Sequence, residues 1–276
     1  MQSNSHLFRI LFIGDISGRY GRRFLNKSLP IIKIKFSPHL VIANGENSAG
    51  GLGITPKTAK EIFDAGVDVI TTGNHVWDKK EALGLLKEND SIIRPINYPE
   101  LAPGKGYTVF SGHGNVNVEA MIVNLQGRVF MEPVVDNPFL CMDRFLEQVK
   151  QKIIIVDFHA EATAEKQAMG FYLDGRVSAV LGTHTHVQTS DLRILTNGTA
   201  YQSDVGMTGS LDSVIGMKQE TVIPKFITGV NQKFEVAKEN IIMDIALLDI
   251  DRNNGKAVNV RSMRIFESTY DEQLKF

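Results

Sequence analysis

Residues 177–186 read Val-Ser-Ala-Val-Leu-Gly-Thr-His-Thr-His, a short apolar run that ends in two histidines. A continuous apolar run bounded by glycine is typical of a strand that is buried on both faces. In an extended chain His184 and His186 project to the same side, because side-chain direction alternates with a period of two. Both imidazoles can therefore reach one metal site, so the stretch predicts a buried strand that delivers ligands at its carboxyl end.

Four earlier apolar runs end in a similar way. Each polar residue alone has an ordinary explanation, since Asp and Asn are turn formers and a lone histidine beside a strand is most often structural. Turn chemistry alone would not favour His, Asn or a carboxylate over Ser, Pro and Gly at five successive strand ends. In open α/β sheets, ligands bind beyond the carboxyl ends of the strands. The runs 7–13, 40–43, 67–72 and 153–158 are followed by Gly14-Asp15, by Asn44-Gly45-Glu46-Asn47, by Gly73-Asn74-His75 and by His159.

The order of the elements predicts the fold class. In the first part of the chain, apolar runs alternate with helix-like stretches. One of these stretches, 56–65, begins at Pro56, with Thr55 as its N-cap. Pro30 should kink or split an earlier helix over 21–36. Antiparallel strands around the turn at 253–255 follow near the end. We expect an α/β fold of two packed sheets with helices outside, in one domain over 1–276, with a long excursion over 206–237.

Composition narrows the class of protein. The chain has 276 residues, 43% of them hydrophobic and 22% charged, and a formal net charge of −1, which argues against a broad basic surface for long nucleic acids. Its one cysteine, Cys141, excludes an intrachain disulfide and a cysteine-based metal cluster. Arg9 interrupts the first apolar run, which is too short to span a bilayer. These features indicate a cytoplasmic protein without a membrane partner.

The candidate ligands offer nitrogen and oxygen but no sulfur. Imidazole, carboxylate and amide ligands together suit Mn, Fe, Zn or Co, and argue against a calcium site or a structural cysteine–zinc site. The sequence therefore predicts a transition-metal site at the strand ends.

In this order the motifs resemble the calcineurin-like metallophosphoesterases. Three departures are informative: Ser17 stands where that family has a histidine, Glu46 stands where it has an aspartate, and one residue is inserted after Gly182. With these departures the chain resembles the YmdB-like subfamily of bacterial phosphodiesterases over most of its length.

The resemblance implies a four-layer α-β-β-α sandwich and a centre of two divalent or mixed-valence transition-metal ions, Fe or Mn. It also implies hydrolysis of 2′,3′- and 3′,5′-cyclic nucleotides. Asn47 would replace the ligand that is lost at Ser17. The implied ligands are Asp15, Glu46, Asn47 and His186 for the first ion, and Glu46, Asn74, His159 and His184 for the second, with Glu46 bridging.

Charge balance agrees with a phosphodiester substrate. Two divalent ions keep a positive excess over two carboxylates, and a bridging hydroxide with one phosphodiester anion would neutralise it. Attack by that hydroxide leaves an alkoxide, which His75 would protonate as general acid; its alternative role is to orient a ligand. Asp157 and Glu161 flank His159 in sequence and are candidates to orient it. Glu161 is equally well explained as a first-turn helix acid, and Asp204 is a further candidate for a supporting role.

Two other functions stay open at this point. A phosphomonoesterase or nucleotidase would use the same centre, and an additional Arg or Lys near the ions would favour it because monoesters are dianions. A regulatory protein would keep the metal site and only bind a nucleotide. The expected partner is a small nucleotide phosphodiester, and a homo-oligomer is compatible with the sequence.

Overall fold

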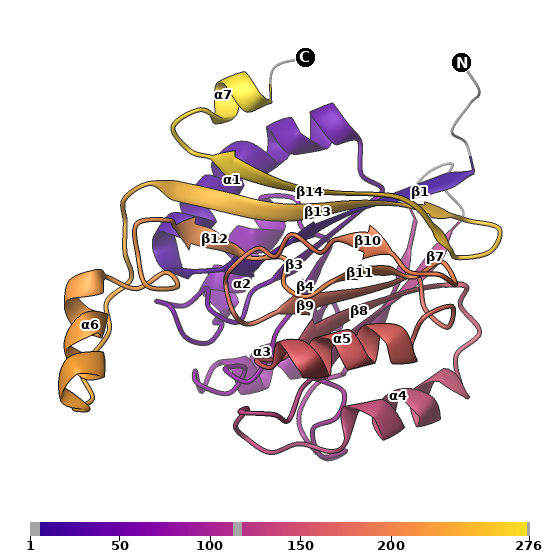
Figure 1. The fold of residues 1–276 in the computed structure, drawn as a ribbon, viewed down its shortest axis with the longest axis horizontal. Coiled ribbons are helices and arrows are strands. Elements are labelled where there is room, and N and C mark those ends of the chain that lie inside the picture. The colour runs from indigo at the N-terminus through magenta and orange to yellow at the C-terminus, as the bar shows by residue number, and fades with distance from the viewer. Residues whose placement is uncertain (1–5, 113–117, 275–276) are drawn as a thin grey trace.

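The computed structural model describes residues 6–112 and 118–274 of the chain. It has a mixed α/β fold in which two β-sheets pack face to face and helices lie outside them (Figure 1). The mixed α/β class expected from the sequence is confirmed.

The first sheet contains eight strands within the described residues. Its centre is parallel, because β1, β3, β4 and β5 run in one direction, and β13 lies antiparallel to β1 on the other side. The hairpin of β13 and β14 turns at 252–256, where the sequence predicted it. In spatial order the strands are β2 (Asp15–Ile16), β12 (Met207–Ser210), β13 (Ile241–Asp251), β1 (Leu7–Ile13), β3 (Leu40–Asn44), β4 (Val69–Thr71) and β5 (Ile92–Ile93), with β14 (Ala257–Phe266) paired to β13.

The second sheet contains six strands in the described part of the chain. Its four inner strands are parallel, and an antiparallel strand closes each edge. In spatial order they are β10 (Arg193–Ile194), β11 (Ala200–Gln202), β9 (Ala179–Thr183), β8 (Ile153–His159), β7 (Glu119–Gln126) and β6 (Tyr107–Ser111).

Alternation along the strands builds separate apolar cores. In β1, Phe8 and Phe12 pack between the two sheets, whereas Leu11 and Ile13 pack against helices on the outer face. In β8, Ile155 faces the other sheet. Strands buried on both faces read as continuous apolar runs, which is why these segments were recognisable. The second sheet has an outer core of its own, with Met142 from α4 and Met169 from α5.

Helices cover the outer faces of both sheets. Pro30 lies inside α1, which continues through it, so of the two expected effects, a kink or a split, the split does not occur. Thr55 caps α2 by accepting a hydrogen bond from the backbone N–H of Thr58, as predicted. No helix within 6–112 and 118–274 is long and apolar enough to cross a bilayer. The helices are α1 (Gly18–Phe36), α2 (Pro56–Asp64), α3 (Ala82–Glu88), α4 (Pro138–Leu146), α5 (Thr163–Tyr172), α6 (Gln219–Thr228) and α7 (Tyr270–Gln273).

The segment 206–237 begins inside the first sheet and then leaves it. Its first residues form β12, which pairs with β2 and β13. The chain then runs outward to α6, which stands off one end of the two sheets (Figure 1). Only Val222 of α6 is buried. This helix therefore contributes little to the main core.

Candidate metal centre

All predicted ligands converge on one edge of the molecule. The parallel strands of both sheets end there, so side chains that are far apart in sequence meet. Asp15, Glu46, Asn47 and Asn74 come from the first sheet and its loops, and His159, His184 and His186 come from the second.

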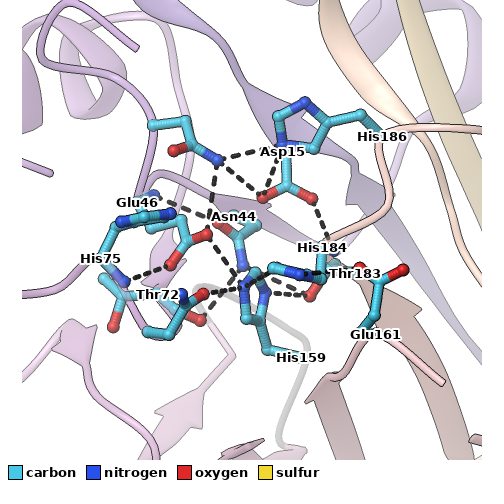
Figure 2. A network of polar contacts seen from close by, with 12 residues as sticks. Asp15, Asn44, Glu46, Thr72, His75, His159, Glu161, Thr183, His184 and His186 are labelled. Carbon is cyan, nitrogen blue, oxygen red and sulfur yellow. Dashed lines mark hydrogen bonds and ion pairs between the residues drawn. The ribbon is translucent and has the colours of Figure 1, made fainter. Parts of the chain in front are cut away.

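The first group of contacts joins Glu46 to three residues. The Glu46 Oε1 atom lies 2.9 Å from His159 Nε2, which lies 3.1 Å from His184 Nδ1 and 3.1 Å from Asn74 Oδ1. One ligand atom each from Glu46, His159 and His184 fall within 4.8 Å of one another. Figure 2 shows these three side chains turned toward a common centre. These three residues could therefore hold a metal ion.

The second group lies on the other side of Glu46. The amide nitrogen of Asn47 lies 3.0 Å from His186 Nε2, 3.3 Å from Glu46 Oε1 and 3.5 Å from Asp15 Oδ1. His186 Nε2 is 3.8 Å from Asp15 Oδ1. Glu46 therefore touches members of both groups. A half-turn of the Asn47 amide would present its oxygen, the atom that a hard ion binds.

Ser17 is not part of this cluster. Its hydroxyl is buried and has no hydrogen-bond partner among the described residues. It faces the backbone near Gly216 instead, where an added Cβ would come within 2.6 Å of the Ser17 oxygen. Ser17 therefore contributes nothing to these contacts.

Electrostatics at Glu46 and His159 reflect their pairing. Burial raises the pKa of the Glu46 carboxyl, but the charge and hydrogen bond of His159 outweigh burial and lower it to about 2. Burial lowers the pKa of His159, but Glu46 overcomes this and raises it to about 9. The two form a buried imidazolium–carboxylate pair. A divalent ion between them would take the place of the shared proton, so the donor set fits a metal.

Burial also shifts the pKa values of His184 and Asp15, and a bound cation would favour the metal-binding form of each. Burial, followed by the positive charge of His159, lowers the pKa of His184 to about 3, so this imidazole is neutral, the form that binds metals. Burial also raises the pKa of Asp15 against the opposing charges of His186 and His159. A buried carboxylate and a neutral imidazole both gain from a nearby divalent ion.

A hydrogen-bonded chain orients His159. Its Nδ1 lies 2.8 Å from the Thr183 hydroxyl, which donates to Asp157 Oδ1 at 2.6 Å. The Asn44 amide donates to the other Asp157 oxygen at 3.2 Å. Burial, only partly offset by His159 and Thr183, raises the pKa of Asp157 to about 7. These hydrogen bonds keep His159 Nε2 directed at the centre, as is usual for metal-binding histidines.

Glu161 contacts a different histidine from the one expected. Its Oε2 lies 3.0 Å from Nε2 of His184, whereas His159 is held through Thr183. Glu161 therefore sits behind His184, whose other nitrogen faces the centre. The sequence neighbourhood of His159 and Glu161 suggested their pairing, but the turn after β8 carries Glu161 past His159.

His186 is oriented by the outlying segment, residues 206–237. Its Nδ1 donates to the backbone carbonyl of Ile215 at 2.9 Å, because a carbonyl can only accept. The proton on Nδ1 leaves Nε2 of His186 facing Asp15 and Asn47. Sequence reasoning did not find this contact, since a backbone acceptor leaves no signal in residue type.

Lys166 is a further residue that sequence reasoning missed. Its side chain is 2% exposed, and its ammonium group donates to Asp204 Oδ2 at 2.7 Å and to the carbonyl of Thr183 at 2.8 Å. Asp204 also accepts the backbone N–H of Thr185 at 2.9 Å. The pair therefore clamps the loop that carries His184. One signal was available: Lys166 occupies the helix face of Met169 and Gly170, which is otherwise without charge.

His75 lies beside the two groups without joining them. Its backbone N–H donates to Glu46 Oε2 at 3.1 Å, and its Nδ1 lies 2.8 Å from Asp78 Oδ2. The structure gives its Nε2 no hydrogen-bond partner among the described residues. His75 is therefore positioned by Asp78 with one ring nitrogen available.

Two glycines permit the close approach of these strands. A Cβ on Gly73 would lie 2.2 Å from the His159 ring and 2.5 Å from Glu46 Oε2. A Cβ on Gly182 would lie 1.8 Å from the carbonyl oxygen of Ser203. A side chain at Gly73 would push Glu46 and His159 apart, and one at Gly182 would collide with the backbone of Ser203.

A cavity of about 490 Å³ opens onto the cluster. Glu46, Asn47, His75, His184 and His186 line one part of it, and the segment 214–234 lines another. The volume lies in the range of small-ligand pockets. The cluster is therefore accessible to a small molecule.

Comparison with known proteins agrees with the geometry. A family model described as YmdB-like protein matches residues 11–263. The 2′,3′-cyclic-nucleotide 2′-phosphodiesterase of Bacillus subtilis strain 168 is 46% identical over 259 residues, which cover 93% of this chain and 97% of that protein. A crystal structure described as a novel phosphatase from Mycoplasma pneumoniae has a TM-score of 0.89 at 35% identity and covers 97% of both chains.

A hypothetical protein from Thermus thermophilus has a TM-score of 0.88 at 43% identity, covering 94% of this chain and 100% of that chain. The matched relatives cover 93% or more of this chain, and residues 11–263, which the family model matches, contain every residue of the cluster. The chain therefore belongs to the family of YmdB-like proteins.

Proposed function

We propose that this chain is a metal-dependent phosphodiesterase that hydrolyses small phosphodiesters, with 2′,3′- and 3′,5′-cyclic nucleotides as substrates. Its named relatives are a phosphodiesterase and a phosphatase, so the chain is a hydrolase of phosphoric esters. One observation carries the proposal: the Glu46 carboxylate touches both ligand groups on the wall of a cavity that His75 also lines.

The proposed centre holds two divalent ions or a mixed-valence pair, Fe or Mn. Bound ions of this kind lower the pKa of water and withdraw charge from phosphate oxygens. The first ion would be held by Asp15, Glu46, Asn47 and His186, and the second by Glu46, Asn74, His159 and His184. Asp157, Glu161 and Asp204 would support the ligands through the contacts described above.

His75 is the proposed general acid. When a water-derived oxygen bonds to phosphorus, the bond from phosphorus to the ribose oxygen breaks and that oxygen needs a proton. His75 can donate it from Nε2, while Asp78 holds Nδ1 and stabilises the charged imidazole. A general acid typically contributes ~10²–10⁴-fold to rate.

The surrounding architecture forms part of the proposal. We propose a single domain over 1–276 with the outlying segment 206–237, arranged as α-β-β-α layers. The three apolar clusters, one between the sheets and one under the helices of each sheet, support that order. We also propose that the protein works in the cytoplasm, which is supported by its one free cysteine, Cys141.

Lys225 is the observation that favours the second candidate, a phosphomonoesterase or nucleotidase. It lines the cavity, and a cation there would help to hold a dianion. Its ammonium group lies 5.3 Å from the centre of the Phe234 ring. Lys225 therefore belongs to the part of the cavity that segment 206–237 lines, and it does not lie among the proposed ligands.

The deciding experiment is a paired assay on protein of measured metal content. Bis-p-nitrophenyl phosphate and p-nitrophenyl phosphate are compared, followed by cyclic mononucleotides. Faster turnover of the diester supports the proposal, and faster turnover of the monoester, lost in Lys225→Met, would replace it with the second candidate. Bound ions without turnover of any substrate would indicate a regulatory binding protein.

Glu46→Gln tests the bridging role directly. The amide keeps the shape of the side chain but removes the charge that two ions would share. We expect lower metal content and no measurable turnover, with Glu88→Gln as the control that keeps both ions, because Glu88 is exposed on α3 and does not line the cavity. A variant that keeps two ions and full activity would refute the bridging assignment.

A further inference from the structure

The cavity has two chemically different parts. One part is the polar cluster around Glu46, and the other is formed by the outlying segment. Apolar side chains make up nearly all of the second part: Val214, Ile215, Met217, Val222, Phe226 and Phe234. Among the described lining residues of this wall, Lys225 alone carries a charge.

Two of these apolar side chains lie outside the core. The Phe226 side chain is 79% exposed and that of Phe234 is 38% exposed, although both are large and apolar. Exposed apolar side chains that are grouped beside a polar site are typical of a ligand pocket.

The wall and the polar cluster are fixed relative to each other. The Ile215 carbonyl accepts the hydrogen bond from His186, so a residue of the wall also orients a proposed ligand. Ile215 has φ 47° and Gly216 has φ 95°, a tight turn that aims this carbonyl at His186. A molecule with its phosphate at the cluster therefore meets the wall at a set distance.

A nucleobase has the chemistry that this wall recognises. It is flat, its faces are apolar, and in a cyclic nucleotide it lies one sugar away from the phosphate. Stacking of a base on an aromatic side chain contributes about 1–3 kcal/mol and tolerates every base. The side chains of the wall offer almost no hydrogen-bonding groups that would read a base edge.

We propose that Phe226 and Phe234 form a nucleobase subsite, with Lys225 at its side. This inference rests on the proposed phosphodiesterase function and adds the part of the substrate that binds away from the phosphate. The subsite selects for the presence of a base rather than for its identity. All four 2′,3′-cyclic nucleotides should therefore react with kcat/KM values within about ten-fold of one another.

The test compares a substrate with a base to one without. Adenosine 2′,3′-cyclic phosphate and glycerol 1,2-cyclic phosphate share the reacting five-membered ring, and only the first carries a base. Stacking at the strength given above predicts a wild-type kcat/KM preference of roughly 5–150-fold for the nucleotide. Phe226→Ala and Phe234→Ala should each reduce this preference, mainly by raising KM for the nucleotide.

Ile227→Ala is the matched control. Ile227 lies on the same helix and is 77% exposed, but it does not line the cavity, so this variant should keep the wild-type preference. Circular dichroism and metal content confirm that each variant is folded and loaded.

Three outcomes would overturn the subsite. Equal losses of Phe226→Ala on both substrates would make the wall a structural support. An unchanged preference would place the base elsewhere. A change in oligomeric state with unchanged kinetics would make the wall a contact between copies of the chain. Wild-type protein that hydrolyses neither compound, nor bis-p-nitrophenyl phosphate, nor a 3′,5′-cyclic nucleotide, would instead refute the proposed function itself.

Discussion

At the scale of single residues, His75, the proposed general acid, is held by Asp78 and lies beside the proposed metal ligands. Asp78 Oδ2 holds one ring nitrogen at 2.8 Å, and the other is available to the cavity. Neither residue belongs to the two ligand groups. Variants of His75 should therefore change proton transfer while leaving the ions in place.

His75→Ala should lose about 10²-fold or more in kcat on a cyclic nucleotide. It should lose clearly less on bis-p-nitrophenyl phosphate, because nitrophenolate leaves without a proton. Steady-state kinetics on both substrates, with metal content measured in parallel, checks this. Asp78→Asn, which keeps the imidazole, should show a smaller loss of the same kind.

Equal losses on both substrates with intact ions would mean that His75 positions the phosphate. Loss of an ion would place His75 among the ligands. The two results point to different contacts of one side chain, so the pair of assays distinguishes them.

The ligand candidates were readable from sequence because each follows a strand. Asn74 and His159 stand at ends of buried apolar runs, and parallel strands bring such ends together. The partner of Glu161 was not readable, because the path of the turn after β8 decides which histidine it meets. The His186–Ile215 contact was hidden for a simpler reason, since its acceptor is backbone.

At the scale of elements, Lys166 ties helix α5 to the loop after β9. The buried ammonium holds Asp204 at 2.7 Å, and Asp204 holds the N–H of Thr185. Lys166→Met should reduce the free energy of unfolding by about 3–5 kcal/mol, because it leaves the Asp204 carboxylate buried without its partner. Urea denaturation measures this loss.

The same variant should bind the second ion more weakly, since the loop carries His184. Lys60→Met is the matched control, because its ion pair with Asp64 is exposed and should matter little. Lower stability together with unchanged metal affinity would show that Lys166 supports the fold alone.

A second prediction at this scale concerns the start of β3. The Nδ1 atom of His39 accepts the backbone N–H of Arg9 at 2.8 Å, which joins this end to β1. Burial, and then the charges of Arg252 and Arg9, lower the pKa of His39. Below the ordinary value near 6.5 the unfolded chain binds a proton that the folded chain does not, so stability falls as pH falls.

His39→Asn should flatten this pH dependence, because its amide oxygen accepts the same hydrogen bond without titrating. Urea denaturation between pH 7 and pH 5 should show a steeper loss for the natural protein than for the variant. Parallel curves for the two proteins would contradict the assignment to His39.

At the scale of the whole molecule, the proposed ions join the two sheets. Glu46 and His159 come from different sheets and are both fully buried. Chelation should therefore lower Tm by roughly 5–10 °C relative to protein in free ion at about 100 times Kd. Differential scanning calorimetry measures the shift, and Glu46→Gln should show a smaller one.

The mixed α/β class was predictable for the whole chain because both sheets are built from strands buried on two faces. The position of α6 was not predictable. Its exposed apolar residues, such as Phe226, do not pack against the core. The hydrophobic pattern of this segment therefore did not indicate where the helix lies. Pro30 shows the reverse case, since helix packing over Leu25 and Leu29 keeps α1 continuous through a residue that usually breaks helices.

The place of β13 has a consequence for the timing of synthesis. This strand lies between β12 and β1 in the first sheet, yet it is made after every proposed ligand. A nascent chain that has reached His186 already carries every proposed ligand, but the sheet that positions Asp15 is still missing its central antiparallel partner. Hydrolytic capacity should therefore arise only after residues 241–251 have left the ribosome, and a message cut short before them would give a protein with all of its ligands and no working centre.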